Sequence, residues 1–280
     1  MHLFVDNLTN VDFSYLDHHR GVVGETWLAN AALDGALDHQ GMVVDFGIVK
    51  KTLRNWLDDE LDHRLLVPTR SAHLSLQQEA GRLTLTWRLP AERKITVSGP
   101  EQAFALVEAE SITAESVATW CVQQLAGVFP TSVDQLNLSF TCEEIPSPFY
   151  HYSHGLKKHD GNCQRIAHGH RSRIRIDRNG ERSAELEHLW SQRWADIYLG
   201  TREDLQKEED GQLHFAYRAR QGDFALSIPS DRCELLHCDT TVEQLAQYIA
   251  DTLAEQSPGD TLTVRAYEGI GKGAVAQSRR

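Results

Sequence analysis

Three histidines and one cysteine gather in a short central stretch of the chain, and their spacing suits a metal site. His168 and His170 are two residues apart, and residues 171–176 after them alternate in the way typical of a strand. Because residues two apart on a strand point to the same face, both imidazoles can reach one ion. His154 ends another apparent strand and could supply a third nitrogen. Three imidazoles with an open fourth position are a catalytic arrangement for Zn²⁺, which is the ion we expect here.

Other interpretations of these histidines remain open at the level of sequence. A His-x-His tripeptide is a weak signal by itself, and a pair of ordinary surface histidines is its more common explanation. The third histidine and the nearby cysteine shift the balance towards a metal site. His159 is a competing candidate ligand, but its neighbours are typical of a polar loop, so we rank it below His154.

Cys163 lies in a Gly-Asn-Cys turn between the candidate ligands. It could be a fourth ligand, a small buried side chain or a catalytic thiolate. A nearby zinc ion and basic side chains would lower the pKa of the thiol and favour the thiolate. The basic residues that follow His170 on the strand are expected to face away from the histidines. The simpler explanation for them is that they form a solvated face of the sheet. The basic residues close in sequence are Lys157, Lys158, Arg165, Arg171, Arg173 and Arg175.

The elements that must position these side chains occur twice along the chain. Three blocks recur in the same order and at a nearly constant offset, which indicates a tandem duplication. The matching blocks are residues 81–88 and 211–218, residues 111–118 and 239–246, and residues 138–143 and 263–268.

Each copy has the pattern of strands combined with helices. Residues 83–87 and 213–217 alternate as strands do and are rich in β-branched and aromatic residues. Thr113 and Thr241 stand at N-cap positions, and apolar residues at helical spacing follow each of them. A polar turn then leads from each helix into a further strand. The sequence therefore predicts an α+β fold in which each half is an antiparallel sheet backed by helices.

The length and composition agree with two modest domains. The chain has 280 residues, of which 41% are hydrophobic and 24% charged, an ordinary balance for a globular protein with a sizeable core. We place the boundary near residues 146–148, so that the first half spans residues 1–145 and the second half spans residues 146–280.

The charge and the cysteines argue against several classes of function. A net charge of −12 disfavours nonspecific nucleic-acid binding, and an anionic substrate would need a locally basic pocket. The first residues lack a basic segment followed by a long apolar run, and no apolar stretch is long enough to span a bilayer. We therefore expect no signal peptide and no membrane partner. Five scattered cysteines do not suggest a disulfide framework, and a reducing cytoplasm is the expected location.

In combination, these residues resemble the 6-pyruvoyl-tetrahydropterin synthase and 6-carboxytetrahydropterin synthase family. Members of that family have an aromatic strand ending in the first zinc histidine, then a cysteine, then His-Gly-His. These features match residues 150–154, Cys163 and residues 168–170. The family's Gly-Met-Val-x-Asp-Phe and Leu-Asp-His-x-x-Leu segments match residues 41–46 and 61–66. The resemblance covers nearly the whole chain, and the motifs are specific when taken together.

Two further features of the family appear once in each half. The Thr-x-Glu start of a helix begins at Thr113 and at Thr241, and the late glutamate that anchors the pterin is Glu143 or Glu268. Because only the second half has metal ligands, we expect Glu268 to anchor the substrate, with Thr241 also binding it and Glu143 as the other candidate. Without the resemblance, both glutamates could be surface charges at strand ends.

The departures from the family pattern differ between the halves. In the first half, Asp17 stands at the first ligand position and residues 23–25 read Val-Gly-Glu in place of His-Gly-His, so this half is expected to have lost zinc. The second half keeps the ligands and Cys163 but has no Asp-His pair, and residues 194–197 are only a faint relic of the Met-Val-x-Asp segment. Active sites of the family lie between subunits, so we expect the two halves to act as unlike subunits that share one site.

The resemblance implies two tandem units of the tunnelling fold (T-fold), with helices packed on one face of each sheet, and the chemistry of a carbon–oxygen lyase. The expected substrate is 7,8-dihydroneopterin triphosphate, from which triphosphate is eliminated, and the expected product is a 6-pyruvoyl or a 6-carboxy pterin. Members of the family assemble into barrels around a central tunnel, so a homo-oligomer is expected. Duplication predicts fewer chains in the same ring, such as a trimer.

The family assigns a role to each candidate residue. Zinc on the three histidines would act as a Lewis acid on side-chain oxygens of the substrate. Cys163 would be the general base, and His63, oriented by Asp62, would exchange a second proton. Glu268 would accept hydrogen bonds from the ring NH groups of the pterin. Taken without the family, Asp62 and His63 could simply be an exposed helix end.

Two other functions fit the same residues. The fold could be kept as a pterin- or purine-binding protein with little turnover, because half of the sites have decayed. It could also be a zinc-stabilised scaffold in which the first half serves only assembly. Product formation, saturable binding without product, and unfolding on zinc removal would distinguish the three.

Overall fold

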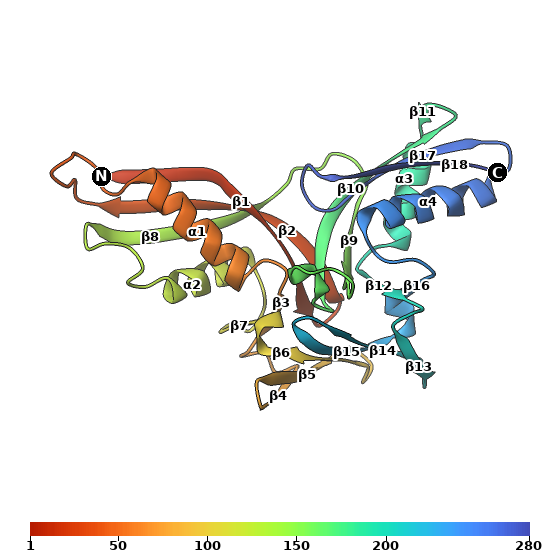
Figure 1. The fold of residues 1–280 in the computed structure, drawn as a ribbon, viewed down its shortest axis with the longest axis horizontal. Helices are drawn as coiled ribbons and strands as arrows, with labels where there is room; N and C mark the ends of the chain where they lie inside the picture. Colours follow the sequence, from red (N-terminus) through yellow and green to blue (C-terminus); the bar gives the residue numbers. More distant parts are fainter.

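The computed structural model describes residues 1–280 and shows two halves of similar plan, one at each end of an elongated molecule (Figure 1). The first half contains β1 (His2–Asp17), β2 (Gly21–Gly35), α1 (Phe46–Glu60), β3 (Leu65–Pro68), β4 (Leu74–Glu79), β5 (Arg82–Arg88), β6 (Lys94–Pro100), β7 (Phe104–Val107), α2 (Ala114–Gln124) and β8 (Val133–Cys142). The second half contains β9 (Phe149–His154), β10 (His168–Arg178), β11 (Glu181–Arg182), α3 (Ala184–Arg193), β12 (Ile197–Thr201), β13 (Leu205–Glu209), β14 (Gln212–Ala219), β15 (Gly222–Pro229), β16 (Cys233–Leu236), α4 (Val242–Gln256), β17 (Thr261–Tyr267) and β18 (Gly273–Arg279). Three single turns of 3₁₀ helix are η1 (Glu101–Ala103), η2 (Asn162–Gln164) and η3 (Ser230–Arg232).

The order of strands in the two main sheets repeats, as a tandem duplication requires. The sheet of the first half runs β7-β3-β1-β2-β8, and that of the second half runs β16-β12-β9-β10-β17 with β18 added at its edge. The short β11 pairs with β10 outside this order. Every strand of the first main sheet therefore has an equivalent at the same place in the second, and β18 has none in the first.

At one end of each main sheet, two strands run parallel to their neighbours, whereas the sequence led us to expect antiparallel pairing. β3 pairs in parallel with β1 and β7, and β12 pairs in parallel with β9 and β16. A parallel connection needs a crossover of a dozen or more residues, usually with a helix. β2 with α1 in one half, and β10 with α3 in the other, provide it.

The helices bury one apolar face each against these sheets. Thr113 and Thr241 cap α2 and α4 with their side chains, as the sequence predicted. α4 then buries Leu245, Ile249 and Leu253, which recur at helical spacing, in the core of the second half. None of the helices combines the length and the apolar character needed to cross a membrane.

The second hairpins of the two halves join in one six-stranded sheet, which the sequence did not predict. Its order is β13-β14-β15-β6-β5-β4, and the joint is the antiparallel pair of β15 with β6, where Leu226 lies opposite Val97. Apolar residues of both halves share one core at this sheet, and Trp87 and Phe215 are buried within it. The two halves are therefore packed as one body.

The first hairpins of the halves, β1–β2 and β9–β10, cross at a point where two glycines touch. A Cβ atom on Gly24 would lie 1.8 Å from the Tyr152 carbonyl oxygen, and one on Gly169 would lie 2.6 Å from the Gly24 Cα atom. The Ser14 and Ser153 hydroxyls share a hydrogen bond of 2.7 Å at the same crossing. Only glycine permits this approach, which brings β1 of the first half against the histidines of the second.

Candidate active site

The three predicted histidines come together where β9 and β10 pair. His154 lies directly opposite His168 in the strand register, and His170 follows two residues later on the same face of β10. All three side chains are fully buried, and one ring nitrogen of each lies within 4.8 Å of the other two. The His159 ring is not part of this cluster, and its Nδ1 accepts a hydrogen bond from the Gly161 N–H.

Hydrogen bonds hold Nδ1 of His154 and of His168, and the Nε2 atom of all three rings is free to bind an ion. His154 Nδ1 lies 3.0 Å from the Thr240 carbonyl oxygen, and His168 Nδ1 lies 3.1 Å from the Arg165 carbonyl oxygen. Because a carbonyl oxygen only accepts, both Nδ1 atoms carry the proton and both Nε2 atoms hold a lone pair. These Nε2 atoms and that of His170 are buried without a hydrogen-bond partner. Buried polar atoms are rarely left unpaired, so the residues fit a metal ion with three imidazole ligands.

Burial also favours the neutral form of these rings, which is the form that binds a metal. It lowers the pKa of His154 and of His168 well below the ordinary value, and the neighbouring imidazoles add to the effect. His154 and His168 therefore need no deprotonation before they can act as ligands at neutral pH.

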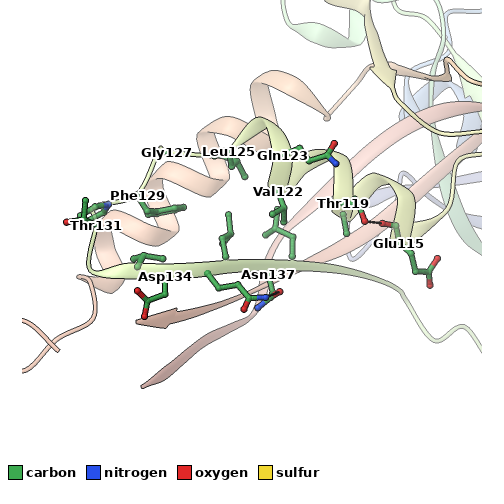
Figure 2. A pocket seen from close by; sticks show the side chains of 17 residues that line it. Glu115, Thr119, Val122, Gln123, Leu125, Gly127, Phe129, Thr131, Asp134 and Asn137 are labelled. Carbon is green, nitrogen blue, oxygen red and sulfur yellow. Dashed lines mark hydrogen bonds between the residues drawn. The ribbon is translucent and has the colours of Figure 1, made fainter. Parts of the chain in front are cut away.

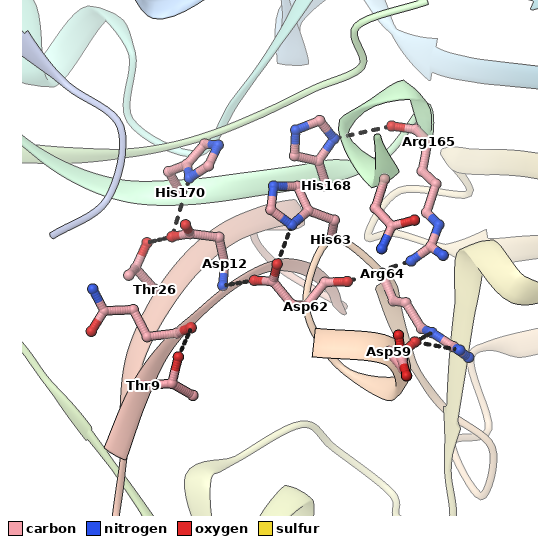
Figure 3. Close-up of polar contacts among 12 residues, drawn as sticks. Thr9, Asp12, Thr26, Asp59, Asp62, His63, Arg64, Arg165, His168 and His170 are labelled. Atoms are coloured by element: carbon pink, nitrogen blue, oxygen red, sulfur yellow. Dashed lines mark hydrogen bonds and ion pairs between the residues drawn. The ribbon is translucent and has the colours of Figure 1, made fainter. Parts of the chain in front are cut away.

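The Asp62–His63 pair of the first half lies beside the histidines of the second half (Figure 3). The ring centroids of His63 and His168 are 5.0 Å apart. One ligand atom from each of His63, Cys163 and His168 lies within 4.8 Å of the others, and His63 Nδ1 contacts the Asp62 carboxylate. The two halves thus bring complementary groups to one place, which is the arrangement expected from the motifs that each half has lost.

A short turn after α1 places His63 in the site. Its φ is +57°, in the left-handed region that residues other than glycine seldom adopt. The His63 N–H donates to the Asp12 carbonyl oxygen at 2.6 Å, and the Asp12 N–H donates to the Asp62 carboxylate at 2.7 Å. These bonds to β1 hold the turn in a conformation that is often found at functional sites.

Asp62 and Cys163 control the protonation of His63. Burial alone would lower the pKa of this imidazole, but the hydrogen bonds with the Asp62 carboxylate and the Cys163 thiol raise it to about 10. Without a metal ion nearby, His63 is therefore protonated at neutral pH. The ring can then donate a proton inside the site.

Of the two glutamates considered as substrate anchors, Glu268 is the one beside the histidines. Glu268 follows β17 directly, and its Oε1 lies 3.7 Å from His170 Nε2. Glu143 follows β8 at the equivalent place in the first half and instead pairs with Arg173 at 3.6 Å. The position of Glu268 agrees with the preference for it at the level of sequence.

Thr241 is not one of the residues of the histidine cluster. It lines a cavity of about 140 Å³ at the start of α4 together with Thr240, whose hydroxyl lies 3.0 Å from His154 Nδ1. This volume is below that of typical small-molecule sites. A contact between Thr241 and the substrate therefore stays a prediction.

Most of the basic side chains that lie near Cys163 in the sequence are paired with acids. Lys157 contacts Asp204 at 2.6 Å, and Lys158 contacts Glu203 at 2.9 Å. Arg165 is the exception, because it is buried beside the site and donates to the Asp62 carbonyl oxygen at 3.4 Å.

The arginines that follow His170 on β10 lie at the surface of the sheet, and two of them also pack on aromatic rings. Arg171 lies over the Phe149 ring at 4.2 Å, and Arg173 lies over the Tyr267 ring at 4.5 Å. Such cation–π contacts cover the apolar ring faces at the sheet surface. Arg175 and Arg178 are exposed.

Comparison with known proteins identifies the family of the chain. The model of the 6-pyruvoyl tetrahydropterin synthase family matches the chain twice, over residues 13–152 and residues 145–279. The chain belongs to this family. Its fold is α+β and consists of two tandem T-fold units, each with helices on one face of its sheet.

Individual relatives are distant. A putative 6-carboxy-5,6,7,8-tetrahydropterin synthase from Pyrococcus horikoshii is 25% identical over 116 residues, which are 41% of this chain and 65% of that protein, just under two thirds. The 6-pyruvoyl tetrahydropterin synthase structure from Plasmodium vivax is 20% identical, covers 52% of this chain and 93% of its own, and has a TM-score of 0.42. That from Plasmodium falciparum is 15% identical, covers 50% and 90%, and has a TM-score of 0.41.

The strand register locates the family's ligand positions in the first half and corrects one assignment. With the touching glycines taken as equivalent, Tyr15 lies opposite Val23 just as His154 lies opposite His168. Tyr15, and not Asp17, therefore takes the place of the first ligand. Asp17 instead accepts hydrogen bonds from two backbone N–H groups of the β1–β2 turn.

The segment 194–197 also has a different equivalent from the one expected. Asp196 precedes β12 with a φ of +55°, as His63 precedes β3, so this segment stands at the place of the family's Asp-His pair. Asp196 pairs with Arg20 at 2.6 Å, and the Arg20 guanidinium also donates to the Tyr15 hydroxyl at 2.8 Å. In the first half, the Arg20 guanidinium thus bridges the equivalents of His154 and of His63.

Three further residues reach the site although no motif singles them out. Asp12 Oδ1 lies 3.2 Å from His170 Nδ1, and the Thr26 hydroxyl donates to the same oxygen at 2.5 Å (Figure 3). Lys272 Nζ lies 3.2 Å from Asp12 Oδ2 and 3.8 Å from Glu268 Oε2. Burial alone would raise the pKa of Asp12, but His170 and Lys272 hold it well below its usual range.

The largest cleft of the structure lies elsewhere, between α2 and β8 in the first half (Figure 2). Its volume is about 840 Å³, and its apolar lining includes Val122, Leu125, Phe129 and Leu136. None of its lining residues belongs to the histidine clusters. Its lining also includes the acids Glu115 and Asp134 but no histidine or cysteine.

Proposed function

We propose that the protein is a zinc-dependent pterin synthase. It would be a carbon–oxygen lyase that removes triphosphate from 7,8-dihydroneopterin triphosphate and yields a 6-pyruvoyl-tetrahydropterin or, after cleavage of the side chain with loss of its two outer carbons, a 6-carboxy-tetrahydropterin. Membership of the family supports the pterin synthase part of this proposal. The observation that carries it is the meeting of three unpartnered histidine nitrogens with Cys163 and His63 in one largely buried site. A purely structural metal site would not need a thiol and a carboxylate-held imidazole beside its ligands.

The histidine triad would hold the ion and leave room for substrate. His154, His168 and His170 would bind through Nε2, and the carbonyl oxygens that hold two of the Nδ1 atoms would fix the ring orientations. When bound, Zn²⁺ supplies a Lewis acid for the side-chain oxygens of the substrate. Three protein ligands leave a fourth position for those oxygens.

Cys163 and His63 would move the protons. Cys163 Sγ, as the thiolate, accepts a proton from a side-chain carbon of the substrate, and the carbon–oxygen bond to triphosphate breaks with its electron pair leaving on the triphosphate. His63 exchanges a proton with a side-chain oxygen through the ring nitrogen that Asp62 does not hold. Asp62 keeps the other nitrogen protonated and the ring in place.

Glu268 would anchor the pterin ring. Its carboxylate can accept hydrogen bonds from two ring NH groups at once, because the two donors lie in one plane. The triphosphate needs local positive charge in a chain whose net charge is −12. Arg165 and Lys272 are the basic side chains that reach the site.

We also propose a homo-oligomer, a trimer, in which a second copy of the chain covers the cleft between α2 and β8. In the second half, β18 pairs along β17 beside α4. α2 and β8 are the equivalents of α4 and β17, but no strand pairs with the outer edge of β8. A long unpaired edge next to an apolar cleft is a template for a strand of another chain. A stable monomer in light scattering would contradict this assembly.

The test of the lyase function is mass spectrometry of the products formed from 7,8-dihydroneopterin triphosphate by the zinc-loaded protein. We expect triphosphate release and a 6-carboxy- or 6-pyruvoyl pterin, which differ in mass. The same protein treated with a chelator is the control and should form neither. Unchanged substrate with folded, zinc-loaded protein would contradict the proposal, and saturable binding without product would then favour a pterin-binding role.

A further inference from the structure

We infer that Asp12 of the first half is a positioning residue for the metal site of the second half, where its carboxylate holds the Nδ1 edge of His170 so that Nε2 faces the ion. The inference rests on the metal site proposed above. Asp12 Oδ1 lies 3.2 Å from His170 Nδ1, and both side chains are almost completely buried. This is a close polar contact and not an aligned hydrogen bond, because neither ring nitrogen of His170 has a hydrogen-bond partner of good geometry, and Nε2 is left free.

His170 differs from the other two ligands in what holds it. His154 and His168 are held by backbone carbonyl oxygens of their own half, at Thr240 and Arg165. His170 is held by a carboxylate, and that carboxylate comes from the other half. A carboxylate on the far nitrogen fixes the tautomer and makes the imidazole a stronger donor to the metal.

Asp12 is itself held on several sides. The Thr26 hydroxyl donates to Oδ1 at 2.5 Å, and Lys272 Nζ lies 3.2 Å from Oδ2. The main chain of Asp12 accepts the N–H of His63 and donates to the Asp62 carboxylate. Asp12 thus contacts a proposed metal ligand, His170, through its side chain. Through its backbone it contacts the proposed proton-transferring pair, Asp62 and His63.

The corresponding place in the other half shows why this contact belongs to the metal-bearing site. By the same register, His151 is the equivalent of Asp12 and Glu25 is the equivalent of His170. His151 Nδ1 lies 3.9 Å from Glu25 Oε2, so acid and imidazole have exchanged positions. There the imidazole belongs to no ligand triad, and its Nδ1 bonds to the Gly24 carbonyl oxygen at 2.7 Å.

The test is the zinc affinity of Asp12→Asn, measured by competition with a chromophoric chelator in the absence of substrate. We expect the variant to bind zinc about 10- to 100-fold more weakly than the wild type, which is the usual effect of losing such a partner. Asp6→Asn is the matched control, because Asp6 is an exposed acid on the same strand. It should bind zinc as the wild type does.

The outcomes separate this inference from the metal site itself. A wild type that binds no zinc would overturn the metal site, whereas equal affinity of wild type and Asp12→Asn would overturn the role of Asp12 alone. If Asp12→Asn does not fold, ¹⁵N NMR of the histidines in the wild type decides. Zinc on His170 Nε2 with a proton on Nδ1 supports the inference, and the reverse assignment contradicts it.

Discussion

At the scale of residues, the site combines side chains that are far apart in the sequence. The local pattern of His154, His168 and His170 was enough to predict the ligand triad, because the spacing along two strands already brings the rings together. The role of Asp12 could not be predicted in this way, because it depends on how β1 crosses β10.

The first ligand position of the first half was predicted wrongly because the connections within the two first hairpins differ in length. The turn between β1 and β2 spans residues 18–20, whereas the loop between β9 and β10 spans residues 155–167. Counting from the turn therefore points to Asp17 instead of Tyr15. The signal in the sequence was the repeat of an aromatic residue and a serine before this position, in residues 13–14 and 152–153.

Cys163→Ala should abolish turnover while zinc remains bound. A positioned general base typically contributes at least about 100-fold to the rate, so a loss of that size or more is expected with 7,8-dihydroneopterin triphosphate. Cys238→Ala is the control, because Cys238 is another partly buried free cysteine of the same half. Zinc content should be equal in both variants, and an unchanged rate in Cys163→Ala would remove the thiol from the mechanism.

At the scale of elements, what the sequence predicted best was local. Helices capped by Thr113 and Thr241, and strands with alternating apolar residues, follow from short patterns and are confirmed. The pairing of β6 with β15 was not predicted, because strands such as these can pair along either edge and the choice depends on distant packing. The parallel pairs of β3 and β12 were missed for the same reason.

The crossing of the two first hairpins predicts a large effect from a small substitution. Gly24→Ala would put a Cβ atom 1.8 Å from the Tyr152 carbonyl oxygen, so the hairpins must separate. We expect the free energy of unfolding to fall by roughly 1–3 kcal/mol, as in other overpacked cores. Zinc affinity should fall with it, because the separation moves Asp12 away from His170.

Urea unfolding at a fixed zinc concentration measures this effect. Gly81→Asn is the control, because a Cβ atom there meets nothing within 4 Å and asparagine tolerates the φ of +79°. Wild-type stability in Gly24→Ala would mean that the crossing is looser than the structure shows.

At the scale of the whole molecule, the two halves of the duplicated chain contribute different groups to the candidate site. The second half holds the ligands and Cys163, and the first half holds the Asp62–His63 pair and the Asp12 carboxylate. Where the first half would have its own site, Arg20 bridges Asp196 and Tyr15. The shared six-stranded sheet and the glycine crossing hold the two halves in the arrangement that brings these groups together in the candidate site.

We propose that each site is completed within one chain, even in an oligomer of several copies. Co-expression of Cys163→Ala and His63→Ala with different affinity tags, followed by purification through both tags, gives mixed oligomers. In these, every chain carries one defect in its own site. Co-expression of the wild type with the double variant is the control, and those mixed oligomers should keep activity.

Product formation from 7,8-dihydroneopterin triphosphate by the mixed oligomers is the measurement that decides. The structure predicts that oligomers of the two single variants stay as inactive as either variant alone, because Cys163 and His63 of one chain lie in the same cluster. Recovery of substantial activity would contradict it, since it would mean that the thiol of one chain works with the imidazole of another.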